Sequence, residues 1–568
     1  MASSKSRLLL LTFSVILVAL ILSARLFYVQ IVMGHAYRDL AEQQYLNQNA
    51  EIYDRGSVYF QSKDGELVTG AGLLGGYTIA IRPLDIPDPE KTFELLNAII
   101  PLNKEEFLEK ALKKDDPYEE IVKRVESKIA LAIEDRAIPG VHLVKTRWRF
   151  YPAGRAASHV LGFVGYNGDE YSGRYGIERY YDDLLERNKN SLYNNFFAEI
   201  FSGLASQEKN PYQKEGDLVL TIEPKVQGTL EDVLDALEEK YNPRLLGGII
   251  MDPNTGAVRS MAVYPNFDPN TYNEESSVDI FTNPLVENVF EMGSIMKPLT
   301  IASALDAGVL SERDTYFDAG TVQIEDSVIS NFDAKGRGQV TIQEILNQSL
   351  NTGAVHAMQK LGRENFKKYM LSFGFGEKTE IDLPDEVSGL VANLSSRREI
   401  EYATVSFGQG IAMTPIGMTR ALATLANGGY LVRPHVVSEF KYNGFPSRTV
   451  KIDEQRQVLG NETSTRISNM LVTVVDKALA GGSVGIPHYS IAAKTGTAQI
   501  SDAEGGGYYT DRFLHSFFGY FPAYDPKFLV FLFIVEPQGV RFASETLTTP
   551  FMELTKFLLN YYEIPPDR

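Results

Sequence analysis

The chain has no cysteine, a single tryptophan and only seven histidines. The absence of cysteine excludes disulfide bonds, thiolate metal ligands and a cysteine nucleophile. No two of the histidines lie at the close spacing of an HExxH-type metal site; they are His35, His142, His159, His356, His435, His488 and His515. The sequence therefore does not favour a metal enzyme, and we expect a protein that works without a cofactor.

Positive charge is also scarce. The 55 lysines and arginines stand against 73 aspartates and glutamates, which gives a formal net charge of -18. Such a charge repels a phosphate backbone and argues against nucleic acid as a partner. At 568 residues the chain is too long for one compact core, so we expect several domains.

A long apolar run begins at Leu8 and continues without charge to Ala24, and it resumes after Arg25 as far as Met33. Residues 8–33 make about 39 Å of helix, enough to cross a bilayer if Arg25 reaches the interface. Basic residues precede this run, so the positive-inside rule makes residues 1–7 a cytoplasmic tail. We expect a single-pass cell-membrane protein whose bulk lies outside the cytoplasm.

A cleaved signal peptide is the competing interpretation of the same run. Cleavage after Ser23 or Ala24 would place Ile21 or Leu22 at the -3 position, where a small residue is expected. The sequence therefore favours an uncleaved anchor.

Residues 34–242 combine short strand-like runs with turn signals and one charged stretch, Pro89 to Arg136. Within that stretch FELLNAII and IALAIED have helical apolar spacing, which indicates a solvated helical subdomain. Residues 202–216 are polar and contain glycine, as in a loop or linker. We interpret 34–242 as a mixed α/β scaffold domain, in which the single Trp148 serves packing.

Residues 243–568 show a different pattern. LLGGIIMDPNTGAVRSMAVYP, from Leu245, predicts a hairpin with its turn at Asp-Pro-Asn-Thr-Gly. Helical patterns such as QEILNQSLNTGAVHAMQKLG and TRALATLANGG fill the middle, and strand patterns return in YSIAAKTGTAQI, HSFFGYFPA and KFLVFLFIVEP. The pattern predicts an α+β domain whose first and last parts close one antiparallel sheet flanked by helices.

The segment EMGSIMKPLT places Ser294 three residues before Lys297. Positions i and i+3 share a helix face, so the hydroxyl and the amine can touch, as a nucleophile and its base would. Pro298 is best tolerated in a first helical turn and predicts a helix start close to Ser294. The same spacing recurs at Ser206 to Lys209 and at Ser438 to Lys441, so spacing alone does not identify a site.

Two further motifs distinguish Ser294 from the other serines. Ser349-Leu350-Asn351 is the only Ser-x-Asn in the chain, and Lys494-Thr495-Gly496 is the only Lys-Thr-Gly. In this order the three motifs are the set found in penicillin-binding proteins and serine β-lactamases.

The resemblance extends over nearly the whole chain. The matching segments are RGSVYF (55–60), YPAGRAASHVLGFVG (151–165), GRYGIERYYDDLL (173–185), LTIEPKVQ (220–227), SFGQGIAMTP (406–415) and KTGTAQ (494–499). They resemble the class B penicillin-binding proteins, membrane-anchored peptidoglycan D,D-transpeptidases of the division or elongation type. The resemblance implies a dimerisation-like pedestal domain at 34–242 and a transpeptidase domain at 243–568.

The resemblance also implies substrates and partners. Stem peptides of peptidoglycan would acylate Ser294 with release of D-alanine, and β-lactams would inhibit by acylating the same residue. A SEDS-family glycosyltransferase in the membrane would be the usual partner.

The chemistry of the site can be argued from residue types. A lysine serves as base only if burial or nearby positive charge keeps it neutral, so Lys297 is the candidate base and Lys494 a source of such charge. Ser349 would relay a proton to the leaving amine, and Asn351 would orient Lys297 and the substrate amide.

The resemblance assigns the remaining residues to substrate binding. Lys494, Thr495 and Thr497 would hold the substrate carboxylate and align its peptide along an edge strand, and Gly496 would permit close backbone approach. The backbone N–H groups of Ser294 and Thr497 would hold the oxyanion. Gln409 resembles a segment that lines the site. His159 and His515, beside apolar residues, are interpreted as structural.

Two other classes of function remain open. One is a hydrolase with the same residues, either a D,D-carboxypeptidase or a β-lactamase; SLN at the middle motif, where many β-lactamases have SDN, disfavours the second. The other is a β-lactam sensor or a catalytically silent scaffold for a glycosyltransferase. A sensor is expected to have several membrane spans, and the sequence shows one.

Overall fold

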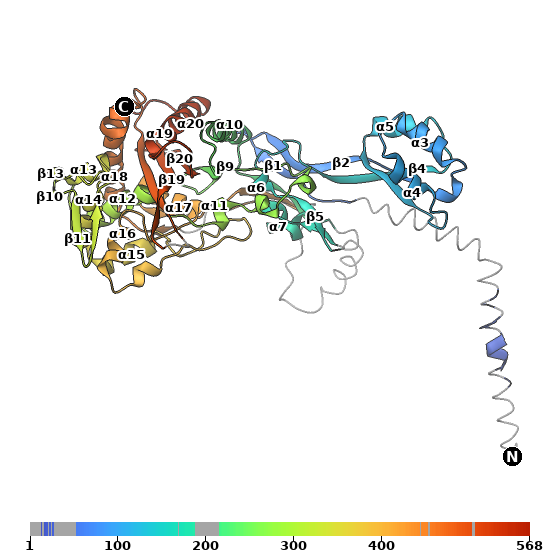
Figure 1. Ribbon diagram of the computed structural model, residues 1–568, viewed down its shortest axis with the longest axis horizontal. Coiled ribbons are helices and arrows are strands. Elements are labelled where there is room, and N and C mark those ends of the chain that lie inside the picture. The colour runs from blue at the N-terminus through green and yellow to red at the C-terminus, as the bar shows by residue number, and fades with distance from the viewer. Residues whose placement is uncertain are drawn as a thin grey trace, which may run out of the picture. The chain divides into compact units, whose positions relative to one another are not determined.

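The computed structural model describes residues 53–187 and 215–568, except for 169, 443–444, 452–454 and 503–505, together with scattered positions between 13 and 27 (Figure 1). Within these residues no helix has both the length and the apolar character needed to cross a membrane. Most of the expected tail and anchor, 1–33, lies outside the described residues. So does the expected linker at 202–216, apart from its last two positions.

The chain forms two compact units, and neither is a single continuous segment. Unit 1 comprises Met1–Asp54 and Leu73–Arg149, and unit 2 comprises Arg55–Gly72 and Phe150–Arg568. Residues 55–72 and 150–187, which the sequence assigned to the pedestal, therefore pack with the larger unit.

Unit 1 packs three helices against a small sheet in which β2 and β3 are antiparallel. The strands are β3 (Glu119–Val125), β4 (Val141–Phe150) and the later part of β2 (Leu67–Ile81), and the helices are α3 (Pro89–Asn97), α4 (Lys104–Ala111) and α5 (Ser127–Glu134). Asp88 caps α3 by accepting a hydrogen bond from the backbone N–H of Lys91. A side chain at Gly76 would come within 2.6 Å of the Trp148 ring, so the tryptophan packs on bare backbone, as expected.

Unit 2 is built around a five-stranded antiparallel sheet in the order β18-β19-β20-β8-β9. The strands are β8 (Leu245–Met251), β9 (Val258–Tyr264), β18 (Ala492–Ser501), β19 (Tyr508–Phe521) and β20 (Phe528–Val535). The first two come from the beginning of the predicted transpeptidase half and the other three from its end. The predicted closure of the sheet by both ends of the domain is confirmed.

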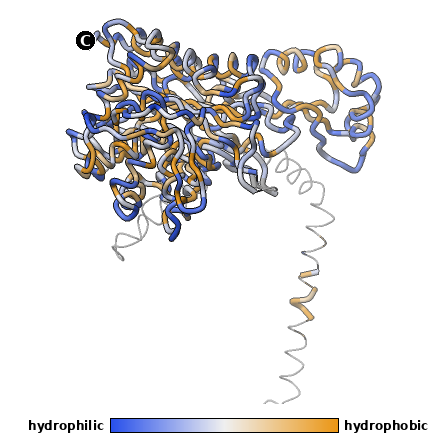
Figure 2. The backbone as a smooth tube through the Cα atoms, turned by 60° about the vertical axis from the view of Figure 1, so that its left-hand side comes forward, coloured by the Kyte–Doolittle hydropathy of each residue, from blue (hydrophilic) through white to orange (hydrophobic). Residues whose placement is uncertain are grey.

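The sheet is covered on both faces, which explains why every residue of β8 and β20 is buried. Along β20, Leu532 and Ile534 pack with α10 (Pro224–Tyr241) and α20 (Thr548–Tyr561). Phe531 and Phe533 face the opposite layer, which contains α12 (Lys297–Asp306), α14 (Asn351–Leu361), α17 (Pro415–Ala426) and α18 (Asn461–Thr473). The outer turns of this unit are hydrophilic (Figure 2).

The β8–β9 hairpin has the turn chemistry expected from its sequence. The Asp252 carboxylate accepts a hydrogen bond from the backbone N–H of Asn254 at 2.9 Å, and Gly256 adopts φ +80°. Both features suit a tight reversal of the chain.

Three of the segments that carry the family resemblance meet in unit 2 at one buried ion pair. The Arg55 Nε donates to Glu178 Oε2 at 2.7 Å, with both side chains almost fully buried. The Tyr151 hydroxyl donates to the other oxygen of Glu178 at 3.2 Å. These contacts join segments 55–60, 151–165 and 173–185 into one structural unit.

Candidate active site

Ser294 lies in a 3₁₀ turn, η5 (Gly293–Met296), that leads directly into α12. Pro298 occupies the first turn of α12, as the sequence predicted, and residues 297–305 of the helix are all buried. Ser294 itself is half-buried. The nucleophile candidate therefore stands at the start of a helix that is anchored in the core.

Lys297 brings two of the three motifs together. Its amine donates to Ser294 Oγ at 3.0 Å, to Ser349 Oγ at 3.1 Å and to the carbonyl of Ser349 at 2.6 Å. The Lys297 side chain is fully buried. One buried amine thus bridges both serine hydroxyls.

Ser349 lies where the helical pattern of residues 343–362 is broken. α13 (Ile342–Asn347) ends before it and α14 begins after it at Asn351. Ser349 has φ +54°, in the left-handed region that a serine rarely occupies. This turn directs both its hydroxyl and its carbonyl to Lys297.

Lys494 completes the cluster from β18, at the edge of the sheet. Its amine donates to Ser349 Oγ at 3.2 Å and to the carbonyl of Thr495 at 3.0 Å, and its side chain is 3% exposed. Thr495 and Thr497 are half-buried on the same strand. An edge strand of this kind has backbone groups available to pair with an extended peptide.

The two lysines share one electrostatic environment. Removal from water lowers the pKa of Lys297 well below the usual lysine value, and the nearby Lys494 lowers it further. Burial also lowers the pKa of Lys494, to about 8. Because the neutral amine is the basic form, the lowered pKa suits Lys297 to accept a proton from Ser294 Oγ, 3.0 Å away.

Three glycines allow the backbone to close around Ser294. A side chain at Gly293 would meet the Thr497 carbonyl at 2.7 Å, and one at Gly408 would meet the Gly293 carbonyl at 2.1 Å. One at Gly496 would meet the Met292 carbonyl at 2.6 Å. Direct backbone contact therefore fixes the turn that carries the nucleophile.

Gly408 and Ser516 also contribute to this packing, and neither residue was singled out in the sequence. The Gly293 N–H donates to the Gly408 carbonyl at 3.2 Å, which explains the presence of the SFGQG segment beside the site. The Ser516 hydroxyl donates to the Met292 carbonyl at 2.7 Å. Glycine and serine have no periodic signal that could have indicated these contacts.

Asn351 lies beside the cluster, but its amide has a different partner from the expected one. Its Nδ2 donates to the Ser330 carbonyl at 2.9 Å, and among the described residues no hydrogen bond joins its side chain to Lys297. Asn351 thus ties the middle motif to the preceding β-hairpin, which β11 (Thr321–Ile324) and β12 (Ser327–Ser330) form.

The other described Ser-x-x-Lys string, at Ser438, has no such surroundings. Ser438 lies in β15 (Val437–Tyr442) and donates to the Val219 carbonyl at 3.0 Å. Ser206 lies outside the described residues. Only Ser294, among the described serines with this spacing, contacts its lysine.

The two histidines interpreted as structural are buried and hydrogen-bonded. His159 Nε2 lies 2.9 Å from the Ile280 carbonyl, and His515 Nδ1 lies 3.0 Å from the Thr546 hydroxyl. Burial lowers the pKa of each to about 4, so both are neutral near pH 7. Neither contacts the serine–lysine cluster.

The geometry is that of a class of proteins, the serine acyl-transfer enzymes that place a buried lysine beside the nucleophilic serine. Comparison with known families agrees. Residues 246–554 match the model of the penicillin binding protein transpeptidase domain, and residues 50–194 match that of the penicillin-binding protein dimerisation domain.

Curated relatives cover almost the entire chain. Stage V sporulation protein D of Bacillus subtilis is 31% identical over 96% of this chain and 84% of its own length. A protein of Mesostigma viride named peptidoglycan D,D-transpeptidase FtsI homolog is 28% identical over 96% of this chain and 94% of its own length.

Solved structures agree in fold. Penicillin-binding protein 2X from Streptococcus thermophilus superposes with a TM-score of 0.73 at 20% identity, covering 90% of this chain and 80% of the other. The chain belongs to the penicillin-binding protein family, in its class B branch.

Proposed function

We propose that this protein is a peptidoglycan D,D-transpeptidase that cross-links stem peptides through an acyl-enzyme on Ser294. One observation carries the proposal: the buried amine of Lys297 lies within 3.1 Å of the hydroxyls of both Ser294 and Ser349. The relatives named as D,D-transpeptidases support the assignment of the substrate.

In the first half-reaction, Ser294 Oγ gives its proton to the neutral Lys297 amine and attacks the carbonyl carbon of the penultimate D-alanine. The bond between Oγ and that carbon forms, and the amide bond to the terminal D-alanine breaks. Ser349, in contact with both lysines, passes a proton to the departing amine. The free D-alanine then leaves.

In the second half-reaction, the amine of a neighbouring stem peptide attacks the ester carbon. A new amide bond forms, the bond to Oγ breaks, and the proton lost by the amine returns to Ser294 through the same groups. Extended pairing of the peptides with the β18 edge would orient them. Before D-alanine leaves, in the first half-reaction, Lys494, Thr495 and Thr497 would hold the terminal carboxylate of the donor.

A solved relative from Mycobacterium described as complexed with aztreonam has the same fold, which supports β-lactams as ligands of this site. We also propose a single membrane anchor at 8–33, with the bulk of the chain extracytoplasmic, and a SEDS-family glycosyltransferase as the membrane partner. The apolar N-terminal run and the family resemblance support these two points.

The test of the proposed function is product analysis with a D-Ala-D-Ala pentapeptide donor and an acceptor amine. We expect D-alanine release with formation of the cross-linked dimer, detected by mass spectrometry. Release of D-alanine with hydrolysed tetrapeptide alone, at every acceptor concentration, would instead establish a carboxypeptidase. No release from folded protein would favour the silent scaffold.

The pH dependence of acylation tests the charges of the two lysines. The acylation rate constant should rise with pH as Lys297 loses its proton, which happens at a pH well below the usual lysine pKa. It should fall near pH 8, where Lys494 becomes neutral. Lys494→Met removes a positive charge beside Lys297, so the pKa of Lys297 goes up. The rising part of the pH–rate profile, its acid limb, therefore moves to higher pH.

Lys494→Arg is the matched control for this profile. It retains the charge, so the acid limb should stay in place while the alkaline limb near pH 8 disappears. An unmoved acid limb in Lys494→Met would contradict electrostatic coupling between the two amines. The measurement is stopped-flow acylation by a chromogenic cephalosporin from pH 5 to 10.

A further inference from the structure

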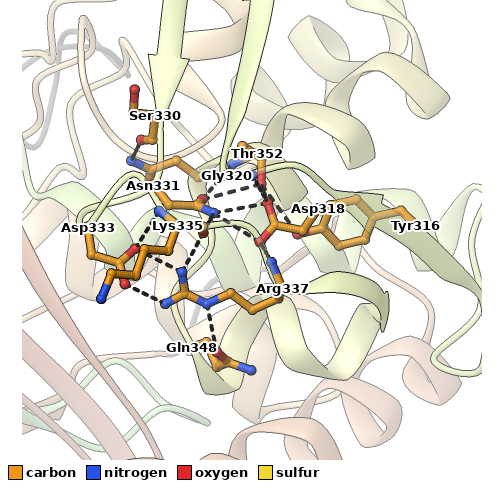
Figure 3. Close-up of polar contacts among 11 residues, drawn as sticks. Tyr316, Asp318, Gly320, Ser330, Asn331, Asp333, Lys335, Arg337, Gln348 and Thr352 are labelled. Atoms are coloured by element: carbon orange, nitrogen blue, oxygen red, sulfur yellow. Dashed lines mark hydrogen bonds and ion pairs between the residues drawn. The ribbon is translucent and has the colours of Figure 1, made fainter.

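Asp318, at the end of β10 (Thr315–Asp318), is a buried carboxylate that lies against Thr352 and Asn331 (Figure 3). It is 1% exposed. Its Oδ1 accepts hydrogen bonds from Thr352 Oγ1 at 2.7 Å, Asn331 Nδ2 at 3.0 Å and Gly320 N at 3.0 Å. Its Oδ2 accepts from Arg337 N at 3.0 Å and from Asn331 Nδ2 at 3.1 Å.

Every one of these neighbours is a donor. A carboxylate can only accept, so both oxygens of Asp318 are matched to their surroundings. An amide in the same place would turn an NH₂ group toward donors and leave buried groups unpaired. The pocket is therefore specific for the negatively charged side chain.

The Asp318 carboxylate holds the residue that follows the middle motif, Ser349-Leu350-Asn351. Thr352 follows Asn351 directly, in the first turn of α14, and its hydroxyl is the closest donor to Asp318. The Thr352 N–H donates to Asn331 Oδ1 at 3.3 Å, and Asn351 Nδ2 donates to the carbonyl of Ser330. All three contacts are made with Asp318 itself or with Ser330 and Asn331, which lie farther along the same segment of chain.

The residue that precedes the middle motif, Gln348, is held by the same segment of chain through Arg337. Arg337, whose backbone N–H binds Asp318, donates through Nε to Gln348 Oε1 at 3.1 Å. Its guanidinium is fixed by Asp333, with contacts of 2.8 and 3.0 Å. Gln348 immediately precedes Ser349, so both sides of the serine are tied to the chain around Asp318.

Ser349 needs such support because its backbone conformation is unfavourable. A non-glycine residue with φ +54° persists only when the surrounding structure imposes it. Its hydroxyl must also stay within 3.1 and 3.2 Å of two different amines. Small displacements at this residue would break the contacts that the proton relay requires.

We propose that Asp318 is a positioning residue for the transpeptidase reaction, holding Ser349 in register with Lys297 and Lys494 through Thr352, Asn331 and Arg337. The inference rests on the proposed function and adds to it a residue outside the three motifs. Asp318 touches neither substrate nor the serine–lysine cluster, so it acts through the geometry of the turn.

The experiment compares four variants of the full chain: Asp318→Asn, Thr352→Val, Thr352→Ser and Asp326→Asn. Thr352→Val keeps the shape of the side chain and removes the hydroxyl bound to Asp318, whereas Thr352→Ser retains that hydroxyl. Asp326→Asn is the matched control, because Asp326 is an exposed carboxylate of the same segment paired with Arg398. Rapid kinetics with a fluorescent penicillin separate the dissociation constant from the acylation rate constant.

We expect the acylation rate constant to fall about 30-fold to 100-fold in Asp318→Asn and in Thr352→Val, with the dissociation constant unchanged, because misplacement of a catalytic group slows chemistry. Thr352→Ser and Asp326→Asn should match the wild type. The fraction of molecules that can be titrated should remain the same in all of them.

A merely structural role has a different signature: a lower titratable fraction with an unaltered rate constant in the molecules that remain folded. That result, or wild-type rate constants in folded Asp318→Asn and Thr352→Val, would overturn the inference. If Asp318→Asn does not fold, the pair Thr352→Val and Thr352→Ser decides. A folded wild type that is not acylated at all refutes the proposed function itself, and the positioning role with it.

Discussion

Ser294→Ala is expected to lose covalent labelling by a fluorescent penicillin completely, while the folded protein remains. Of the three Ser-x-x-Lys serines, Ser294 is the one whose hydroxyl contacts a buried amine in the described structure. The variant keeps the other two hydrogen bonds of Lys297, to the hydroxyl and carbonyl of Ser349, so the site should hold its shape. Removal of a covalent nucleophile lowers such rates by about 10⁶-fold.

Ser438→Ala is the matched control for this experiment. Its hydroxyl donates to the Val219 carbonyl, so the variant loses one partly buried hydrogen bond, about 1 kcal/mol of stability, and no chemistry. Gel fluorescence after denaturation, with melting temperatures for each protein, measures both effects. Persistent label in Ser294→Ala would place the acyl-enzyme elsewhere and contradict the assignment.

Lys297→Met is expected to lower the acylation rate constant by about 10⁴-fold, the upper range for loss of a general base. Without the amine, the Ser294 hydroxyl has no described group positioned to take its proton. Methionine has a similar length and can fill a fully buried position. Stopped-flow acylation at several drug concentrations is the measurement.

The same variant should raise the melting temperature. Folding lowers the pKa of Lys297, so below the usual lysine pKa the unfolded chain binds its proton more readily than the folded one, and the amine destabilises the fold at neutral pH. Removal of the amine abolishes that cost. Acylation within tenfold of wild type would assign the base to another group.

The sequence was sufficient to predict features that depend on local pattern. The hairpin at 245–264, the final strands and the helix start after Ser294 follow from apolar alternation, turn residues and one proline. The three motifs named the residues that the fold brings together: Ser294, Lys297, Ser349 and Lys494 lie in one hydrogen-bonded cluster.

Features that depend on long-range packing could not be read from the sequence. The break at Ser349 interrupts a pattern with continuous helical periodicity, because contacts to distant Lys297 and to the Asp318 segment impose the left-handed turn. Asn351 donates to a backbone carbonyl. Every residue has such a carbonyl, so the side chains in the sequence do not indicate which one will be its partner. The close approach of Gly293 to Gly408 also involves backbone alone.

The glycine contacts around Ser294 have a consequence for antibiotic resistance. At Gly293, Gly408 and Gly496 any added side chain meets a neighbouring carbonyl at 2.1 to 2.7 Å, so substitution would displace the nucleophile needed for wall synthesis as well as for drug capture. Substitutions at these three glycines are therefore not expected to give resistance to a β-lactam. Adaptive mutations would have to fall at other positions, where a side chain can be exchanged without moving the turn that carries Ser294.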